Sequence, residues 1–195
     1  MHRYQGHALA VYSDDNAASW SVGGLLPDYS GEASLTELSN GSVLISFRME
    51  GERMPQHPHV RGFARSDDGC ETWNDIYYLD APFIDAPSMQ AIDRSEKTGV
   101  LYFGHPGSFT DRANYTIHQS TNEGASWDFV GVIYPGGAGY SDVHVLPSEG
   151  PGDRLGVAFQ RTINQPGVEG GGYNLGWATM TILPYGDEPP PYLPL

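Results

Sequence analysis

The stretch Ser66-Asp-Asp-Gly-Cys-Glu-Thr-Trp73 recurs at two other places in the chain. The same frame reads Ser13-Asp-Asp-Asn-Ala-Ala-Ser-Trp20 and Ser120-Thr-Asn-Glu-Gly-Ala-Ser-Trp127. The three copies begin at positions 13, 66 and 120, and a period of about fifty residues is typical of propeller blades of four strands each. The sequence therefore predicts an array of similar β units.

Each copy has the chemistry of a tight turn. An aspartate or asparagine lies five residues before the tryptophan and can accept hydrogen bonds from backbone N–H groups further along the turn. Gly69 and Gly124 can supply a positive φ at low steric cost. The tryptophan can pack back across the turn. The repeat is interpreted as a structural turn that marks each unit.

Composition restricts the classes of partner. The chain has 195 residues and a formal net charge of −14, so neither a nucleic acid nor an anionic membrane surface is expected as the main partner. An anionic ligand would need a local cluster of arginines. No apolar run is long enough to span a membrane, and the N-terminal residues do not form a signal peptide. Because they already contain the first repeat, we expect that upstream sequence is missing.

Metal and cofactor chemistry is not indicated. The seven histidines show no metal-ligand spacing, so we predict no metal site and no cofactor. The single cysteine, Cys70, excludes an internal disulfide and is interpreted as a small buried residue of the second turn.

Short strand-like runs separated by turn residues predict an all-β chain, because no sustained helical periodicity is present. Asn40-Gly41 is a strong hairpin signal. The expected strands are 35–38, 43–47, 62–66 and 76–79 in one unit, 89–92, 100–103, 115–120 and 129–134 in the next, and 140–146, 155–159 and 173–182 in the last. Residues 1–185 are predicted to form about three blades, followed by a proline-rich extended tail at 186–195.

The strand count separates the two ends of the predicted blades. Successive connections of an up-and-down antiparallel blade alternate between its ends, so Asn40-Gly41 and the repeated turns share one end. Four candidate functional residues are predicted at the opposite end: Glu32, Arg48, Arg112 and Tyr140. Loops held by a rigid scaffold commonly carry function.

The repeated turn and the segments between its copies resemble the exo-α-sialidase (neuraminidase) family. The turn is similar to the Asp-box of that family, and three further segments follow in the family's order: Gly31–Arg48, His105–Thr116 and Gly139–Asp142. The similarity is closest to lysosomal-type animal sialidases and related bacterial enzymes. It covers roughly residues 6–161 and implies a six-bladed β-propeller of sialidase type, of which this chain supplies about three blades.

The resemblance assigns a role to each segment. Arg48 and Arg112 correspond to two members of an arginine triad that binds the substrate carboxylate through planar, permanently charged guanidinium groups. Tyr140 corresponds to the nucleophile and Glu32 to the base that removes its proton. A neutral phenol avoids repulsion by the substrate carboxylate, and sialidases are the tyrosine exception among glycosidases. The implied reaction is retaining hydrolysis of terminal sialic acids on glycoproteins, glycolipids or oligosaccharides.

The chain also departs from the family pattern. It has no counterpart of the segment with the first arginine or of the general-acid aspartate. Gln160 stands where the family has a glutamate that supports the first arginine. We therefore expect the C-terminal half of a ring, with a missing N-terminal half or a second copy covering the exposed blade faces. The resemblance implies a lysosomal or secretory-route location.

Two other functions are compatible with the sequence. The lack of the first arginine and of the acid fits a non-catalytic sialoside-binding or interaction module. It also fits a truncated product without a function of its own. Each of the four candidate residues could instead be an ordinary surface residue. Arg53, Arg61 and Arg65 are further residues that could contact substrate, but Arg65 flanks a repeated turn at the other end and is interpreted as structural.

Overall fold

The structure, a computed structural model, describes residues 6–49, 60–79, 83–109, 111–163 and 172–182. These residues form antiparallel strands joined by turns, which confirms the predicted all-β class. In this part of the chain no helix is long and apolar enough to cross a membrane. The predicted tail at 186–195 and Arg53 lie outside the described residues.

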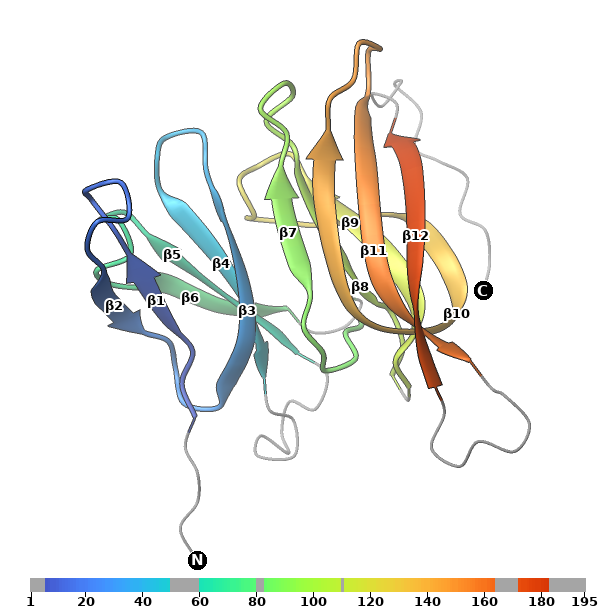
Figure 1. The fold of residues 1–195 in the computed structure, drawn as a ribbon, viewed down its shortest axis with the longest axis horizontal. Helices are drawn as coiled ribbons and strands as arrows, with labels where there is room; N and C mark the ends of the chain where they lie inside the picture. The colour runs from blue at the N-terminus through green and yellow to red at the C-terminus, as the bar shows by residue number, and fades with distance from the viewer. Residues whose placement is uncertain (1–5, 50–59, 80–82, 110, 164–171, 183–195) are drawn as a thin grey trace, which may run out of the picture.

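The strands form three antiparallel sheets, each in chain order (Figure 1). The first sheet has two strands, the second four and the third six. The strands are β1 Leu9–Tyr12, β2 Ser21–Leu25, β3 Ser30–Glu37, β4 Val43–Met49, β5 Arg61–Ser66, β6 Asn74–Leu79, β7 Ala91–Arg94, β8 Leu101–Pro106, β9 Ala113–Ser120, β10 Asp128–Leu146, β11 Asp153–Ile163 and β12 Gly172–Ile182.

The second sheet follows the predicted unit strand for strand. β3 pairs with β4, β4 with β5 and β5 with β6. The second copy of the repeated turn joins β5 to β6, between the third and fourth strands as predicted. The predicted hairpin at Asn40-Gly41 joins β3 to β4, where Gly41 has a φ of 85° and its N–H donates to Leu38 O at 3.1 Å.

The strand prediction misses β1 and β2, which flank the first copy of the turn. β2 contains Gly23 and Gly24, and glycine is depleted in strands because it has no side chain to pack. Here the missing side chains are what permits the packing. A Cβ added at Gly23 would lie 2.1 Å from the backbone oxygen of Cys70, in the second turn. The glycines therefore let β2 approach the second turn closely.

The prediction is also wrong at β10, which is one continuous strand where two, 129–134 and 140–146, are expected. β10 pairs with β9 as far as Gly137 and with β11 from Ala138 onward. The β9–β10 register shifts around Pro135, which has no N–H to donate and is tolerated at such irregularities. β10 thus joins two predicted blades without a loop and carries Tyr140 within a strand.

The three copies of the repeated turn have the same pattern of internal hydrogen bonds. In the second copy, Ser66 Oγ accepts from the Cys70 N–H at 2.8 Å, and the Asp68 carboxylate accepts from the Thr72 N–H at 2.9 Å and from the Thr72 hydroxyl. The first and third copies repeat this pattern with Ser13 and Asp15, and with Ser120 and Asn122. The polar side chains therefore organise each turn as the sequence predicts.

Each turn also places two successive residues in the left-handed backbone region. These are Asn16 and Ala17, Gly69 and Cys70, and Glu123 and Gly124, with φ between 57° and 85°. The predicted use of Gly69 and Gly124 is confirmed, but a non-glycine residue takes the other position in both turns. The first copy has no glycine at either position. Hydrogen bonds to the serine and to the acidic or amide side chain hold this otherwise unfavourable backbone in place.

Trp73 and Trp127, of the second and third turns, pack on a neighbouring sheet, a contact that the sequence analysis did not predict. Trp73 is 9% exposed, and its indole N–H donates to Gly24 O on β2 at 2.9 Å. The Trp127 ring lies 5.4 Å from that of Phe63 on β5. Trp20, in the first turn, is 63% exposed. The second and third turns therefore tie each sheet to the one before it in the chain.

The structure has two ends, as the strand count predicts. The hairpin loops after β3, β7 and β10 lie at the top of Figure 1. The Ser39 N–H donates to Glu123 Oε2 at 3.3 Å, so the third repeated turn lies at the same end as the β3–β4 hairpin. Glu32 near the start of β3 and Arg48 near the end of β4 lie away from this end.

We predict that Trp73→Ala lowers the free energy of unfolding by about 3–5 kcal/mol, because it removes a buried indole that joins two sheets. The matched control is Trp20→Ala at the equivalent position of the first turn, where the exposed ring makes a change below about 0.5 kcal/mol the expected result. Urea unfolding followed by circular dichroism measures both. Equal destabilisation by the two variants would contradict the assigned role.

We also predict that the stabilising effect of Asp68 depends on pH. Hydrogen bonds from Thr72 and Ser66 lower the pKa of Asp68 to about 2, from 3.8. Because the folded-state pKa is depressed, this stabilisation is present above about pH 4 and is lost as the pH falls toward 2. The difference in unfolding free energy between the parent and Asp68→Ala should shrink over that range. Asp128→Ala, at an exposed position on β10, is the control, and a constant difference for Asp68→Ala would refute the prediction.

Candidate functional site

Glu32 and Tyr140 meet although they are 108 residues apart in the chain. Glu32 lies on β3 in the second sheet, and Tyr140 lies on β10 in the third. The phenol of Tyr140 donates a hydrogen bond to Glu32 Oε1. The structure therefore places the predicted nucleophile and the predicted base in direct contact across the junction of two sheets.

A bulge in β3 sets the position of Glu32. The β3–β4 register runs from Ser30 opposite Met49 to Ala33 opposite Phe47, so β3 has one extra residue in this interval. Such bulges re-aim side chains at strand edges and next to functional sites. Glu32 lies in the bulge.

Arg48 binds the other oxygen of the same carboxylate. Its Nη1 donates to Glu32 Oε2 at 2.8 Å, and the two side chains are 19% and 34% exposed. Arg48 lies on β4, the direct antiparallel neighbour of β3. Each carboxylate oxygen of Glu32 thus has one donor, a guanidinium on one side and a phenol on the other.

Arg112 lies beside the Tyr140 ring, in the connection before β9. Its guanidinium carbon is 5.2 Å from the centre of the Tyr140 ring, a distance suited to a cation–π contact. Its Nε and Nη2 both donate to Pro87 O, at 3.1 and 2.9 Å. All four residues predicted from the sequence are therefore brought together: Glu32, Arg48, Arg112 and Tyr140.

The contacts of Glu32 and Tyr140 move their pKa values in opposite directions. Burial raises the pKa of Glu32, but hydrogen bonds from Tyr140 and Arg48 and the charges of Arg48 and Arg112 outweigh it, so the pKa lies below its ordinary value. The hydrogen bond to Glu32 raises the pKa of Tyr140, and burial adds to this effect. At neutral pH the pair therefore consists of a carboxylate and a neutral phenol, with the phenolic proton directed at the base.

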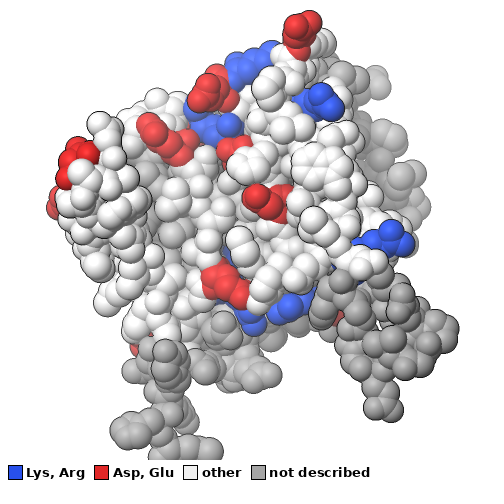
Figure 2. Space-filling view, viewed as in Figure 1, with Lys and Arg blue, Asp and Glu red and all other residues white. Residues whose placement is uncertain are grey.

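The electrostatics of the site differ from those of the whole chain. Two guanidinium groups and one carboxylate surround Tyr140 in a chain with a formal net charge of −14. Figure 2 shows acidic and basic side chains interspersed over one face of the molecule, without a continuous basic tract on its described part. Positive charge at this site is therefore local, as recognition of one small anionic group requires.

Two side chains near the site have positions that the sequence analysis did not predict. Arg61 is fully buried, so it does not offer a surface for substrate, and its Nε donates to Asp85 Oδ2 at 3.1 Å. Gln160 Oε1 accepts from the Tyr140 N–H at 3.3 Å. Asp85 carries no sequence signal of its own, because its partner Arg61 lies in another strand 24 residues away.

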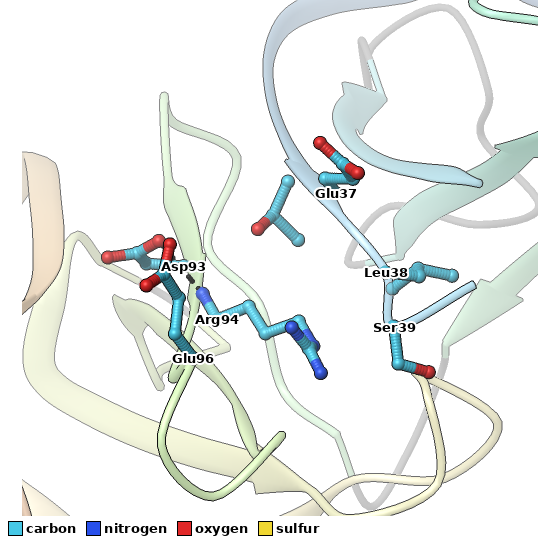
Figure 3. Close-up of a pocket in the computed structure, with 7 residues that line it drawn as sticks. Glu37, Leu38, Ser39, Asp93, Arg94 and Glu96 are labelled. Carbon is cyan, nitrogen blue, oxygen red and sulfur yellow. Dashed lines mark hydrogen bonds between the residues drawn. The ribbon is translucent and has the colours of Figure 1, made fainter. Parts of the chain in front are cut away.

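A hollow lies at the opposite end of the sheets from the candidate site, where β3 and β7 end (Figure 3). Its lining contains three carboxylates and one guanidinium, and the Arg94 N–H donates to Asp93 Oδ1 at 2.8 Å. This acidic lining does not suit an anionic ligand. The lining residues are Thr36, Glu37, Leu38, Ser39, Asp93, Arg94 and Glu96.

The described part of the chain offers no metal site. There, no group of three or more His, Cys, Asp or Glu side chains is placed to hold a metal ion. Cys70 is free and buried, and burial raises the pKa of its thiol.

Comparisons with known proteins point to bacterial sialidases. No family model matches the chain. A sialidase of Micromonospora viridifaciens is 27% identical over 186 residues, which cover 91% of this chain and 27% of that protein. The chain thus spans about a quarter of the length of the curated relatives that it matches.

Solved structures show the same likeness in the fold. The Hadza microbial sialidase Hz136 has a TM-score of 0.67 at 18% identity over 80% of this chain and 30% of that one. The K499G mutant of NanB sialidase from Streptococcus pneumoniae has a TM-score of 0.64 at 21% identity, covering 80% of this chain and 24% of that one. The chain therefore has sialidase homologues at low identity and folds as part of a sialidase-type β-propeller.

Proposed function

We propose that this chain supplies the nucleophile, its base and two substrate-binding arginines of an exo-α-sialidase. The observation that carries the proposal is the hydrogen bond from Tyr140 to Glu32, flanked by Arg48 and Arg112. Similarity to bacterial sialidases supports the substrate class. The substrate is a terminal sialic acid of a glycoprotein, a glycolipid or an oligosaccharide.

The reacting group is Tyr140. Its phenolic oxygen forms a bond to the anomeric carbon while its proton passes to Glu32, and the bond from that carbon to the leaving oxygen breaks. Water then cleaves the tyrosyl intermediate: its oxygen bonds to the anomeric carbon, its proton passes to the group that had protonated the leaving oxygen, and Glu32 returns its own proton to the departing phenol. The two displacements retain the anomeric configuration. The proposal assigns the proton donor for the leaving oxygen to no residue of this chain.

The charge distribution explains the choice of nucleophile. A sialic acid carries a carboxylate on its anomeric carbon, which would repel an anionic nucleophile. A tyrosine phenol is neutral at neutral pH, and the contact with Glu32 raises the pKa of Tyr140 further. Arg48 and Arg112 supply the positive charge that holds the substrate carboxylate beside it. The phenol becomes an effective nucleophile only as Glu32 takes its proton.

We expect Tyr140→Phe to lower kcat for a fluorogenic sialoside by at least about 100-fold, since the ring remains but the nucleophilic oxygen is lost. The assay uses the full-length protein that contains this sequence. The control is Tyr78→Phe, at a half-exposed position on β6. Equal rates for Tyr140→Phe and the parent would overturn the assignment. Binding of the sialoside without turnover by the parent would favour a sialoside-binding module.

We expect Arg112→Met to raise KM about 10- to 100-fold, because hydrogen bonds from a charged donor are worth about 1.5–3 kcal/mol. Arg154→Met, at an exposed position on β11, should leave KM unchanged and serves as the control. Initial rates over a range of sialoside concentrations give KM for each variant. An unchanged KM in Arg112→Met would remove this residue from the binding site.

A further inference from the structure

The segment from Asp85 to Gln90 lies between the second and third sheets and contacts both sides of the candidate site. It follows β6 and leads into β7. Its polar groups form hydrogen bonds with Arg61 on β5, with Arg112 in the connection before β9 and with Ser141 on β10. We call residues 85–90 the crossing segment.

A buried ion pair fixes one side of the crossing segment to the second sheet. Arg61 Nε donates to Asp85 Oδ2 at 3.1 Å, and Arg61 Nη2 donates to Ser88 O at 2.8 Å. Both members of the pair are almost fully buried, at 0% and 1% exposure. Arg61 is also the cross-strand partner of Arg48. The segment is therefore locked to the strand pair that carries the Glu32-binding guanidinium.

The third sheet holds the same segment from the other side. Ala86 N–H donates to Pro106 O at 3.1 Å. His105 Nδ1 lies 3.2 Å from Asp85 Oδ1, and the His105 ring stacks on Phe83 with centroids 4.7 Å apart. Asp85 thus bonds to a guanidinium of β5 and lies beside an imidazole of β8.

The middle of the crossing segment orients Arg112. Pro87 O accepts hydrogen bonds from both Nε and Nη2 of Arg112. These two bonds occupy the side edge of the guanidinium, which Nε and Nη2 form. A carboxylate ligand can then form a bidentate contact only along the remaining edge, which Nη1 and Nη2 form. The Pro87 carbonyl therefore sets both the plane of Arg112 beside the Tyr140 ring and the direction from which an anion approaches it.

The end of the segment reaches the strand of the nucleophile. The Gln90 amide lies 3.1 Å from Ser141 Oγ, and Ser141 directly follows Tyr140. With its nitrogen toward Ser141 and Gly104 O and its oxygen toward Ser88 Oγ, the amide satisfies the polar groups on both sides. The crossing segment thus contacts Arg112 directly. It also contacts Arg61, the cross-strand partner of Arg48, and Ser141, which follows Tyr140.

We propose that the crossing segment is a positioning element of the site, in which the Arg61–Asp85 ion pair holds the Pro87 carbonyl so that Arg112 presents its outer edge to an anionic ligand. This inference rests on the proposed sialidase function for the identity of that ligand. Arg61, Asp85 and Pro87 are positioning residues, because they act through Arg112 and do not touch the substrate.

The test replaces the ion pair by apolar side chains in the double variant Arg61→Met/Asp85→Leu. Such replacements of buried pairs commonly leave the fold intact. We expect KM for the fluorogenic sialoside to rise about 10-fold with a smaller change in kcat. The control is Arg65→Met/Asp67→Leu, which removes an exposed ion pair of 3.0 Å between Arg65 on the same strand and Asp67 in the turn that follows it. That control should leave KM unchanged.

A double-mutant cycle separates positioning from a general loss of structure. In the Arg112→Met background, the apolar swap should change KM less than about twofold, because the group that it positions is already gone. An unchanged KM in a folded swap variant, or the same rise in KM with and without Arg112, would overturn the inference. Asp85→Asn, which keeps the size of the side chain and removes its charge, replaces the swap if the double variant does not fold.

A measurement without substrate distinguishes failure of this inference from failure of the proposed function. In ¹⁵N-labelled protein, the Arg112 Nε–H signal reports hydrogen exchange at the bond to Pro87. We expect exchange at least about 10-fold faster in the apolar swap than in the parent. Unchanged exchange would refute the positioning role whether or not the parent hydrolyses sialosides. Faster exchange in a protein without sialidase activity would support the positioning role and reject only the proposed function.

Discussion

The packing of the second sheet against the third is the constraint on which the rest of the structure depends. Phe63 of β5 is fully buried, and its ring lies 5.7 Å from that of Phe103 on β8 and 5.4 Å from that of Trp127. This apolar contact brings β3 against β7, the edge strand of the third sheet. Glu32 and Tyr140 can share a hydrogen bond only because the two sheets meet at this distance and angle. The chemistry of the site is therefore a consequence of an interface between blades.

Within the site, the charged and polar groups are linked by hydrogen bonds that fix their protonation states and orientations. Arg48 and Tyr140 take one oxygen each of the Glu32 carboxylate, which lowers the pKa of Glu32 and raises that of Tyr140. Arg112 lies beside the phenol ring with part of its guanidinium bound to a backbone carbonyl. The arrangement is preorganised, since donors and acceptors are in place before a ligand arrives, and such preorganisation is the main source of electrostatic catalysis.

The repeated turns and the candidate site have complementary roles at opposite ends of the sheets. Trp73 and Trp127 pack on the sheet that precedes their own, so the turns fix the spacing between sheets. At the other end, the same spacing sets the distance between Glu32 on β3 and Tyr140 on β10. A motif that repeats is structural here, and the residues proposed for the chemistry each occur once.

The sequence by itself determined the turns, the β3–β6 unit and the end at which Glu32, Arg48, Arg112 and Tyr140 lie, because hydrogen bonds within eight residues and antiparallel strand alternation are local properties. Only the tertiary structure decided that β10 is continuous and that Trp73 and Trp127 pack on the neighbouring sheet. It also decided that Arg61 is buried against Asp85. These features depend on contacts between residues far apart in the chain, whose geometry is set by how the sheets pack and not by any pattern along the sequence.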